Sequence, residues 1–345
     1  MTLTARYDAE REALDPRQLC ERVLAQGSKS FALASKLLPV RARADAATLY
    51  TFCRRVDDAI DEAPGDPEPA LRELQLQLRA AYAGGPHRDV AWQAFSDLVR
   101  ETSIPENYPR ELLLGMAMDV SGTRYESLDE LLLYCHRVAG VVGLMMCHVL
   151  GLDRDSALTH AAQLGLAMQL TNICRDVAED FARGRVYIPA SWLRGTPAEA
   201  LLDAPKVSSS AVEREPRELP ERARAALSRA VDRLLVVADA LYAQSRSGLR
   251  SLPWRAAVSI SVAGSLYAAI GRELRARECD VYAGRAVVPA PQKAWLLAEG
   301  AAFAASEGLR RRTRTARHRP PQRAVSFPED VLLPWEPLPK FGALS

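Results

Sequence analysis

Two pairs of aspartates on apolar helical segments set the strongest constraint on how this chain folds. Asp57 and Asp61 lie in YTFCRRVDDAIDE, and Asp176 and Asp180 lie in QLTNICRDVAED, about 120 residues further along. Residues four apart project from one face of a helix, where two like charges cost roughly 0.2–0.5 kcal/mol. The neighbouring positions in both motifs are apolar, which is typical of buried helices. We therefore expect the two helices to converge, with their carboxylates lining one internal site.

The oxygen-bearing side chains in the two motifs favour a divalent cation. Gln169 and Asn172 lie on the same stripe as the second aspartate pair, and Asp58 adds a carboxylate beside the first pair. Carboxylate and amide oxygens without nearby histidine or cysteine suit Mg²⁺, which is usually held by carboxylates together with substrate phosphate oxygens. A single aspartate pair is more commonly part of a solvent-exposed helix face, where neighbouring arginines balance its charge, than part of a metal site. Two copies on apolar helices favour a Mg²⁺ site that binds a diphosphate.

The whole chain has the pattern of an all-α protein. Apolar residues recur every three or four positions, and no convincing alternating run is present. Because the aspartate motifs must converge, we expect a single-domain fold with helices around a central apolar cavity. The domain is predicted over residues 17–308, between an N-terminal extension at 1–16 and a basic tail at 309–345 that is expected to be disordered. The predicted helices are 17–37, 42–61, 68–83, 88–102, 107–119, 128–151, 154–181, 219–248, 254–278 and 290–307.

Charge and cysteine usage exclude several classes of protein. The chain has 345 residues, and its 45 Lys and Arg against 43 Asp and Glu give a net charge of +2, which argues against nucleic acid as a partner. The six cysteines are scattered without a C-x-x-C pair, so they are expected to be buried free thiols in a reducing compartment. The sequence contains no G-x-G-x-x-G motif, the pattern that would indicate a nucleotide-binding loop.

We predict a cytoplasmic protein that contacts membranes only at their surface. The N-terminus is charged and lacks the apolar core of a signal peptide. The apolar runs at 138–152 and 256–270 are shorter than the roughly 20 residues that a bilayer-spanning helix needs. The stretch RRRTRTARHRPPQR at 310–323 suits either a solvated tail or contact with an anionic membrane, where each basic residue adds roughly 1 kcal/mol.

Five longer sequence motifs indicate which protein family this chain resembles. Four of them are GSKSFALASKLLP at 27–39, LYTFCRRVDDAID at 49–61, YCHRVAGVVG at 134–143 and LTNICRDVAEDFARGRVYIP at 170–189. A weaker fifth match is SLYAAIGREL, followed by RECDVYAGRAVVP. From about residue 27 to residue 289 the chain resembles the squalene/phytoene synthases, the head-to-head isoprenyl diphosphate synthases. This resemblance implies the all-α isoprenoid synthase fold.

The resemblance also implies roles for individual residues. The expected metal ligands are Asp57, Asp61, Asn172, Asp176 and Asp180, which bind Mg²⁺ or, as a substitute, Mn²⁺. The expected substrate-binding residues are Ser28, Lys29, Ser30, Phe31, Tyr50, Arg54, Val138, Gly143, Gln169, Asn172, Arg175 and Tyr267. The expected catalytic residues are Arg54, Tyr50, Tyr134, Arg175 and Tyr267. Guanidinium groups suit diphosphate, and aromatic faces or phenol oxygens stabilise a carbocation.

Several of these residues also fit a purely structural role. The three tyrosines could pack in the core with satisfied hydroxyls. Gly140 and Gly143 each cost a helix about 1 kcal/mol relative to alanine, which either close approach of a neighbouring helix or a bound prenyl chain would explain. His136, beside them, has no partner histidine and is predicted to be structural or solvent-facing.

The reaction implied by the resemblance is prenyl transfer. Two geranylgeranyl diphosphates are expected to condense head to head, through prephytoene diphosphate, to phytoene, in the first committed step of carotenoid biosynthesis. NADPH is not an expected cofactor, and other carotenoid enzymes are expected partners. Ser35 and Ala47 are small where farnesyl-using relatives carry bulky aromatics. An aromatic side chain would occupy space that a longer prenyl chain needs, so small residues at these positions favour C20 substrates.

Other functions on similar scaffolds remain alternatives. A presqualene diphosphate, squalene or dehydrosqualene synthase would use farnesyl diphosphate with the same residues. Some proteins of this fold are non-catalytic assembly factors, but those tend to lose metal-binding aspartates that this chain keeps. Head-to-tail prenyltransferases and terpene cyclases differ from NICRDVAED in the spacing and composition of their second metal motif.

Overall fold

The computed structural model describes residues 15–152, 158–193, 195, 201, 220–300 and 302. These residues form helices joined by turns, without any β-strand among them, which confirms the all-α prediction. Residues 290–300 form a last helical segment. The other elements are α2 (Pro16–Gly27), α3 (Lys29–Ser35), α4 (Val40–Asp61), α5 (Glu68–Ala83), α6 (Val90–Thr102), α7 (Asn107–Val120), α8 (Leu128–Cys135), the π-helical turn η1 (His136–Gly140), α9 (Val141–Val149), α10 (Leu158–Ala182), η3 (Ala190–Trp192), α12 (Glu221–Ser245), η4 (Arg246–Ser251) and α13 (Trp254–Ala276).

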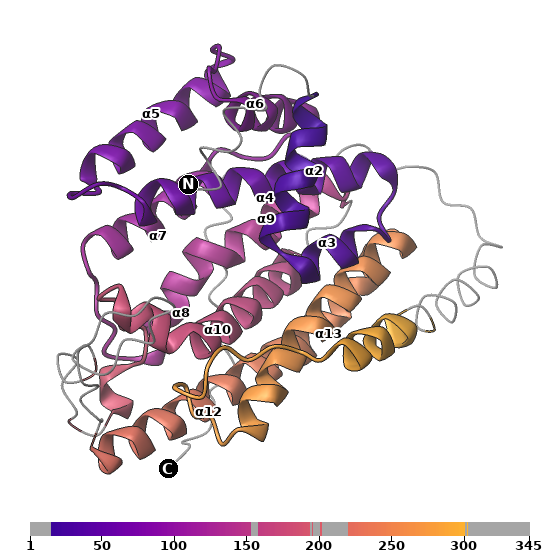
Figure 1. The fold of residues 1–345 in the computed structure, drawn as a ribbon. Helices are drawn as coiled ribbons and strands as arrows, with labels where there is room; N and C mark the ends of the chain where they lie inside the picture. The colour runs from indigo at the N-terminus through magenta and orange to yellow at the C-terminus, as the bar shows by residue number, and fades with distance from the viewer. Residues whose placement is uncertain are drawn as a thin grey trace.

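Helix α10 runs through the middle of the bundle (Figure 1). It contacts α12, α13, η1 and α9, while α4 packs against α2, α6 and α9. Two large apolar clusters result, one centred on α10, α12 and α13 and the other on α4, α7 and α9. Because α9 contacts both α4 and α10, the two helices that carry the aspartate motifs are held in one packed unit.

The apolar positions around both aspartate motifs are buried, as predicted. All are at most 6% exposed: Leu49, Phe52, Val56 and Ile60 on α4, and Leu166, Leu170, Ile173 and Val177 on α10. Burial of one such side chain stabilises the fold by about 1.5–3 kcal/mol. Packing therefore fixes the rotation of both helices about their axes, and with it the direction in which the aspartates point.

The segment predicted as one helix over 17–37 is two helices that meet at Ser28, so the prediction of an unbroken helix was wrong. Ser28 has extended backbone angles, φ −145° and ψ 102°. Its amide donates to the Leu24 carbonyl at the end of α2, and its hydroxyl accepts from the Phe31 amide at 3.2 Å. Serine is a favoured N-cap because it satisfies such a free amide. The break lets α2 lie against α4 while α3 lies against α13.

The helix predicted over 128–151 contains the π-helical turn η1, and the chain here approaches α10 very closely. A Cβ atom on Gly165 would lie 2.2 Å from the carbonyl oxygen of Ala139. One on Gly143 would lie 2.4 Å from the carbonyl oxygen of Ala161. Gly143 therefore serves close helix packing, and a contact with a prenyl chain stays a prediction. Single π turns occur often at functional sites.

Residues Leu128–Val149 form the one helical stretch in the described part of the chain that is long and apolar enough to cross a membrane. The stretch has 22 residues, and its most apolar 18-residue window has a mean hydropathy of 1.4. Yet 56% of its most apolar window is buried against other helices. A core helix explains this composition, since length and hydropathy alone do not separate it from a membrane span.

Candidate active site

The end of α4 and the turn after α10 are joined by ion pairs. Arg183 Nη1 lies 2.9 Å from Asp61 Oδ2, and Arg185 Nη2 lies 2.7 Å from Asp61 Oδ1. These pairs link residues that are 122 and 124 positions apart. Charge-assisted contacts to both oxygens hold the carboxylate firmly. The two aspartate motifs therefore meet in the fold, as their spacing predicts.

Asp57 and Asp180 are the least compensated acids at this meeting point, and both are half-buried. Burial raises the pKa of Asp57 to about 7, and the charge of Asp61 adds to the effect. Burial also raises the pKa of Asp180 to about 8, with the charge of Asp176 as the next cause. A desolvated carboxylate is disfavoured in its ionised form unless a cation compensates it. A bound cation would stabilise these two side chains most.

A further acid, Asp119 on α7, belongs to the same cluster. Its charge contributes to the raised pKa of both Asp57 and Asp180. Tyr134 and Tyr187 donate their hydroxyls to its two oxygens at 2.9 and 2.7 Å. Burial raises the pKa of Asp119, whereas Arg185 and the two tyrosine hydrogen bonds oppose that rise. Tyr134, one of the predicted catalytic residues, thus directs its hydroxyl into the acidic cluster.

Arginines hold the other carboxylates. Arg175 pairs with both oxygens of Asp176, with its Nε 2.7 Å from Oδ1. Arg285 Nε lies 3.3 Å from the same oxygen. One turn apart on α4, Arg54 and Asp58 form an ion pair at 2.6 Å. Asp58 is therefore compensated within its own helix, and Asp176 is shared between two arginines.

The donor set around these acids fits Mg²⁺. Asn172 Oδ1 is buried and has no hydrogen-bond partner, while the Asn172 amide nitrogen donates to Gln169 Oε1 at 3.4 Å. An unmatched buried acceptor costs free energy that a cation would recover. In the chain as described, no three His, Cys, Asp or Glu side chains are gathered closely enough to hold a metal ion. The arginine pairs occupy the carboxylates instead.

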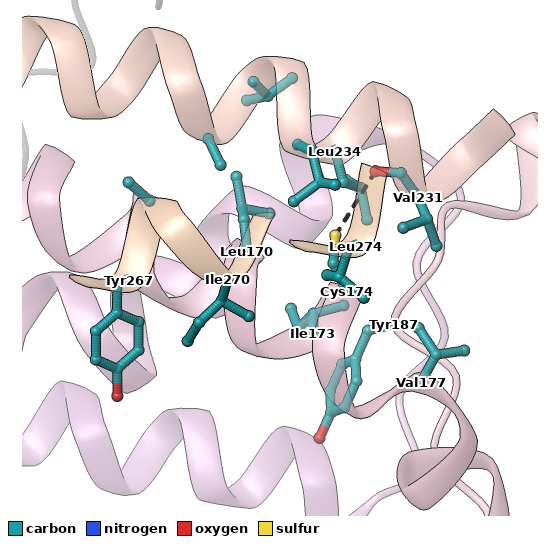
Figure 2. Close-up of a cluster of buried hydrophobic side chains, with 14 of the residues drawn as sticks. Leu170, Ile173, Cys174, Val177, Tyr187, Val231, Leu234, Tyr267, Ile270 and Leu274 are labelled. Atoms are coloured by element: carbon teal, nitrogen blue, oxygen red, sulfur yellow. Dashed lines mark hydrogen bonds between the residues drawn. The ribbon is translucent and has the colours of Figure 1, made fainter. Parts of the chain in front are cut away.

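Aromatic side chains from three helices meet beside the acids. Phe31 stacks on Tyr267 with ring centroids 5.0 Å apart, and its edge meets Tyr50 at 6.3 Å. A Cβ atom on Gly27 would lie 2.3 Å from the Tyr50 hydroxyl oxygen, so glycine admits this tyrosine. Burial raises the pKa of Tyr50 to about 12, which keeps the phenol neutral. Figure 2 shows Tyr267 and Tyr187 directing their hydroxyls to the same side, away from α12.

Polar groups suited to diphosphate surround the Tyr267 hydroxyl. Burial raises the pKa of Tyr267, whereas the charge of Arg175 and hydrogen bonds from Arg175 and Ser28 lower it. Ser30 is half-buried and Lys29 is exposed at the start of α3. The Arg175 guanidinium group and the Ser28 hydroxyl therefore lie at Tyr267, and Arg175 also pairs with Asp176, an arrangement that can bind phosphate oxygens.

The predicted cavity residues lie along the inner helices. Val138 packs against both large apolar clusters, and a Cβ atom on Gly115 of α7 would lie 2.6 Å from its side chain. Ser35 is 8% exposed and donates its hydroxyl to the Ala32 carbonyl. Ala47 is fully buried in a small cluster where α2 and α6 pack on α4. Both small residues are therefore enclosed by side chains rather than open to solvent.

Five residues of the cluster were missed by the sequence prediction: Asp119, Arg183, Arg185, Tyr187 and Arg285. Three of them lie in FARGRVYIP, inside a motif already noted, and Arg285 lies in AGRAVVP. Asp119 is a single acid near the end of the apolar helix α7, which is a weak signal in isolation. Only the contacts between elements reveal their roles.

His136 and the cysteines are structural. His136 is 5% exposed, and burial lowers its pKa to about 4, so the ring is neutral and the solvent-facing alternative is wrong. All six cysteines are free, as predicted, and Cys53 alone is half-buried rather than buried. Figure 2 shows Cys174 inside the α10–α12–α13 cluster, where its thiol contacts the Val231 carbonyl at 3.7 Å.

Known sequences resemble this chain over most of its length. The family model described as squalene/phytoene synthase matches residues 24–292. A phytoene synthase from Rhodobacter capsulatus is 36% identical over 296 residues, which cover 85% of this chain and 83% of that protein. A 15-cis-phytoene synthase from Pantoea ananas is 37% identical over 297 residues, which cover 83% of this chain and 91% of that protein.

Solved structures share the fold. A dehydrosqualene synthase in complex with a ligand has a TM-score of 0.73 at 27% identity, covering 87% of this chain and 99% of that one. The squalene synthase HpnC from Alicyclobacillus acidocaldarius has a TM-score of 0.64 at 23% identity, covering 76% of this chain and 94% of that one. Both likenesses agree with the all-α isoprenoid synthase architecture.

Proposed function

The chain belongs to the squalene/phytoene synthase family, and we propose that it is a phytoene synthase, acting at the first committed step of carotenoid biosynthesis. Two geranylgeranyl diphosphates condense head to head, through prephytoene diphosphate, to phytoene, with release of two diphosphates and two protons. The observation that carries the proposal is the meeting of both aspartate motifs at the Asp61 ion pairs, beside an aromatic-lined apolar interior.

The residues that would hold Mg²⁺ are Asp57, Asp61, Asn172, Asp176 and Asp180. The unpartnered Asn172 oxygen and the raised pKa values of Asp57 and Asp180 support this assignment. When bound, Mg²⁺, or Mn²⁺ in its place, supplies positive charge against the departing diphosphate.

The diphosphate groups are bound by Arg54, Arg175, Ser28, Ser30 and Lys29 in this proposal. Arg175 is already directed toward the aromatic interior, because it hydrogen-bonds to the Tyr267 hydroxyl. A planar guanidinium group can contact two phosphate oxygens at once. These contacts orient the C–O bond of the substrate toward the aromatic side chains.

The aromatic side chains stabilise the carbocations that form from substrate. Departure of one diphosphate leaves an allylic cation, and the C2–C3 double bond of the second substrate attacks it to form the cyclopropyl ring with loss of a proton. Tyr50, Phe31 and Tyr267 surround this region, and an aromatic face attracts a cation by about 0.5–2 kcal/mol. Tyr134 is held in place by its hydrogen bond to Asp119.

The apolar interior keeps water away from these cations. The aliphatic stripe of α10 belongs to the buried clusters, and Val138 packs against them. Gly143 lies on α9, and Gln169 lies on α10. Water would quench a carbocation, so its exclusion is required for a hydrocarbon product. This chemistry needs neither a covalent protein nucleophile nor, in our proposal, NADPH.

A synthase that uses farnesyl diphosphate is the second candidate, because a dehydrosqualene synthase has this fold at a TM-score of 0.73. We also place the enzyme in the cytoplasm, with a peripheral membrane contact, no nucleic acid partner and association with other carotenoid enzymes. We also propose that the domain extends from residue 17 to residue 308. The basic stretch at 310–323 lies outside the described residues.

Product analysis tests the proposal directly. Purified protein is incubated with Mg²⁺ and detergent, with geranylgeranyl or farnesyl diphosphate, and with or without NADPH, and hydrocarbons are identified by mass. Phytoene from the C20 substrate without NADPH is the expected result. A C30 product or presqualene diphosphate would favour the second candidate, and no product from either substrate would favour a non-catalytic role.

A further inference from the structure

The end of the bundle that lies away from the aspartates carries an exposed tryptophan. Helices α4 and α13 both start at this end (Figure 1). Trp254, the first residue of α13, is 49% exposed, and Val40, the first residue of α4, is 73% exposed. The two helix starts are joined, because Arg255 Nε donates to the Leu37 carbonyl at 3.3 Å. The length of α4, about 30 Å for its 22 residues, separates this end from Asp61.

Basic residues surround the exposed tryptophan. Arg255 lies 5.6 Å from the Trp254 ring, and Lys36, Arg246 and Arg250 are exposed on the adjoining turns. No Asp or Glu occurs in the sequence from 29 to 44 or from 240 to 272. On the side of α2, Val40 lines a hollow together with Asp15, Glu21 and Glu101. Arginines pair with Glu21, Asp45 and Glu101 there. We call Lys36, Val40, Arg246, Arg250, Trp254 and Arg255 the helix-start patch.

We propose that the helix-start patch docks this protein onto an anionic lipid bilayer. Tryptophan favours the boundary between lipid headgroups and acyl chains, and arginine and lysine favour anionic headgroups. A protein partner with an apolar groove would not require the basic residues around Trp254. The inference rests on the proposed function, because a C40 hydrocarbon released from the apolar interior needs an apolar acceptor. Docking by this end keeps the charged aspartate cluster away from the lipid.

Vesicle binding of the full-length protein tests the patch without substrate or Mg²⁺. Wild-type protein should co-sediment with phosphatidylcholine vesicles that contain 30 mol% phosphatidylglycerol, a composition chosen as roughly that of an anionic membrane, and should dissociate in high salt. Trp254→Ser should lower the partition coefficient about 10-fold or more, the equivalent of roughly 1.5 kcal/mol of lost burial. Lys36→Glu with Arg246→Glu should lower it about 30-fold or more, since each cation contributes about 5-fold.

Matched variants on α5 provide the control. Leu76 is 58% exposed there, and Arg72 and Arg79 are exposed on the same helix. Leu76→Ser, and separately Arg72→Glu with Arg79→Glu, should leave binding to the vesicles near the wild-type level. All variants should retain wild-type activity in detergent, which shows that they fold.

Several results would overturn the inference. One is wild-type protein that fails to bind the anionic vesicles, and another is an α5 variant that loses as much binding as the patch variants. A third is full binding by the patch variants together with lost binding when residues 310–312 are changed to glutamine. A dimer that Trp254→Ser converts to a monomer, with vesicle binding unchanged, would assign the patch to self-association. An inactive protein that binds vesicles through the patch would refute the proposed reaction only.

Discussion

Replacement of Asp57 by asparagine should stabilise the metal-free protein while it abolishes turnover. Asp57 sits half-buried on α4, and burial raises its pKa from 3.8 to about 7. The folded protein therefore holds this proton more tightly than the unfolded chain does. Between about pH 4 and pH 7 the folded state binds more protons, so stability falls as the pH rises through that range. Asparagine has nearly the same shape and no charge, which removes the cost of ionisation.

The pKa difference sets the size of the effect. A rise from 3.8 to about 7, at roughly 1.4 kcal/mol per unit, corresponds to about 4 kcal/mol at pH 8 and less than about 2 kcal/mol at pH 5. Because Asp57 keeps some solvent exposure, screening reduces this, and we expect about half, or about 2 kcal/mol at pH 8. At roughly 2 °C per kcal/mol for a chain of this size, Tm should rise by about 4 °C.

Thermal unfolding followed by circular dichroism, in EDTA at pH 5 and pH 8, measures this gain. Asp129→Asn on α8 is the matched control, because Asp129 is exposed and its replacement should change stability by less than about 0.5 kcal/mol. Product formation from geranylgeranyl diphosphate and Mg²⁺ checks the loss of turnover. A Tm at or below that of the wild type at pH 8, or an equal gain at both pH values, would refute the desolvation argument. Full activity of the variant would refute the metal-site assignment.

Three further changes test other parts of the structure. Gly165→Ala should lower Tm by about 2–6 °C, because the new methyl carbon would lie 2.2 Å from the Ala139 carbonyl oxygen. The control Gly264→Ala should be neutral or stabilising, because its nearest neighbour would lie at 3.4 Å. Equal melting temperatures of the two variants would contradict the close-packing argument. Asp119→Asn should reduce kcat about 10-fold or more and leave the circular dichroism spectrum unchanged. The asparagine side chain has one acceptor oxygen, so it cannot accept from Tyr134 and Tyr187 as the two carboxylate oxygens do. A wild-type kcat would show that Asp119 has no role in the site. Ser35→Phe with Ala47→Trp should shift the ratio of kcat/KM values toward farnesyl diphosphate by about 10-fold or more, and an unchanged ratio would refute the role of these positions in chain-length selection.

The helical framework could be predicted because each helix carries its own periodic signal. α5 spans the predicted residues 68–83, and α13 begins at the predicted residue 254. The break at Ser28 was missed because the apolar spacing of α2 continues into α3, and only the capping chemistry of one hydroxyl marks it. The π-helical turn was missed for a related reason, since a change of hydrogen-bond register leaves no mark on composition.

The site could be predicted where spacing within one helix determines it. Asp57 and Asp61 share a face of α4, and Asn172 and Asp176 share a face of α10, whatever the rest of the chain does. Contacts between distant elements have no such local signal. The Asp119 network joins α7, α8 and the segment before η3, and sequence reasoning had no means to bring these together. Which arginine neutralises which acid likewise depends on the tertiary fold.

If the acidic cluster binds a cation and a diphosphate as proposed, its arginine pairs couple the two binding events. Arg183 and Arg185 pair with Asp61, and Arg175 pairs with Asp176, so a divalent ion at either carboxylate would displace guanidinium groups. Each displaced arginine is then without its anion, and a diphosphate is a suitable replacement. Conversely, a diphosphate that attracts the arginines leaves the carboxylates ready for the cation. In the proposed site, thermodynamic linkage would then make each ligand raise the affinity for the other by the same factor.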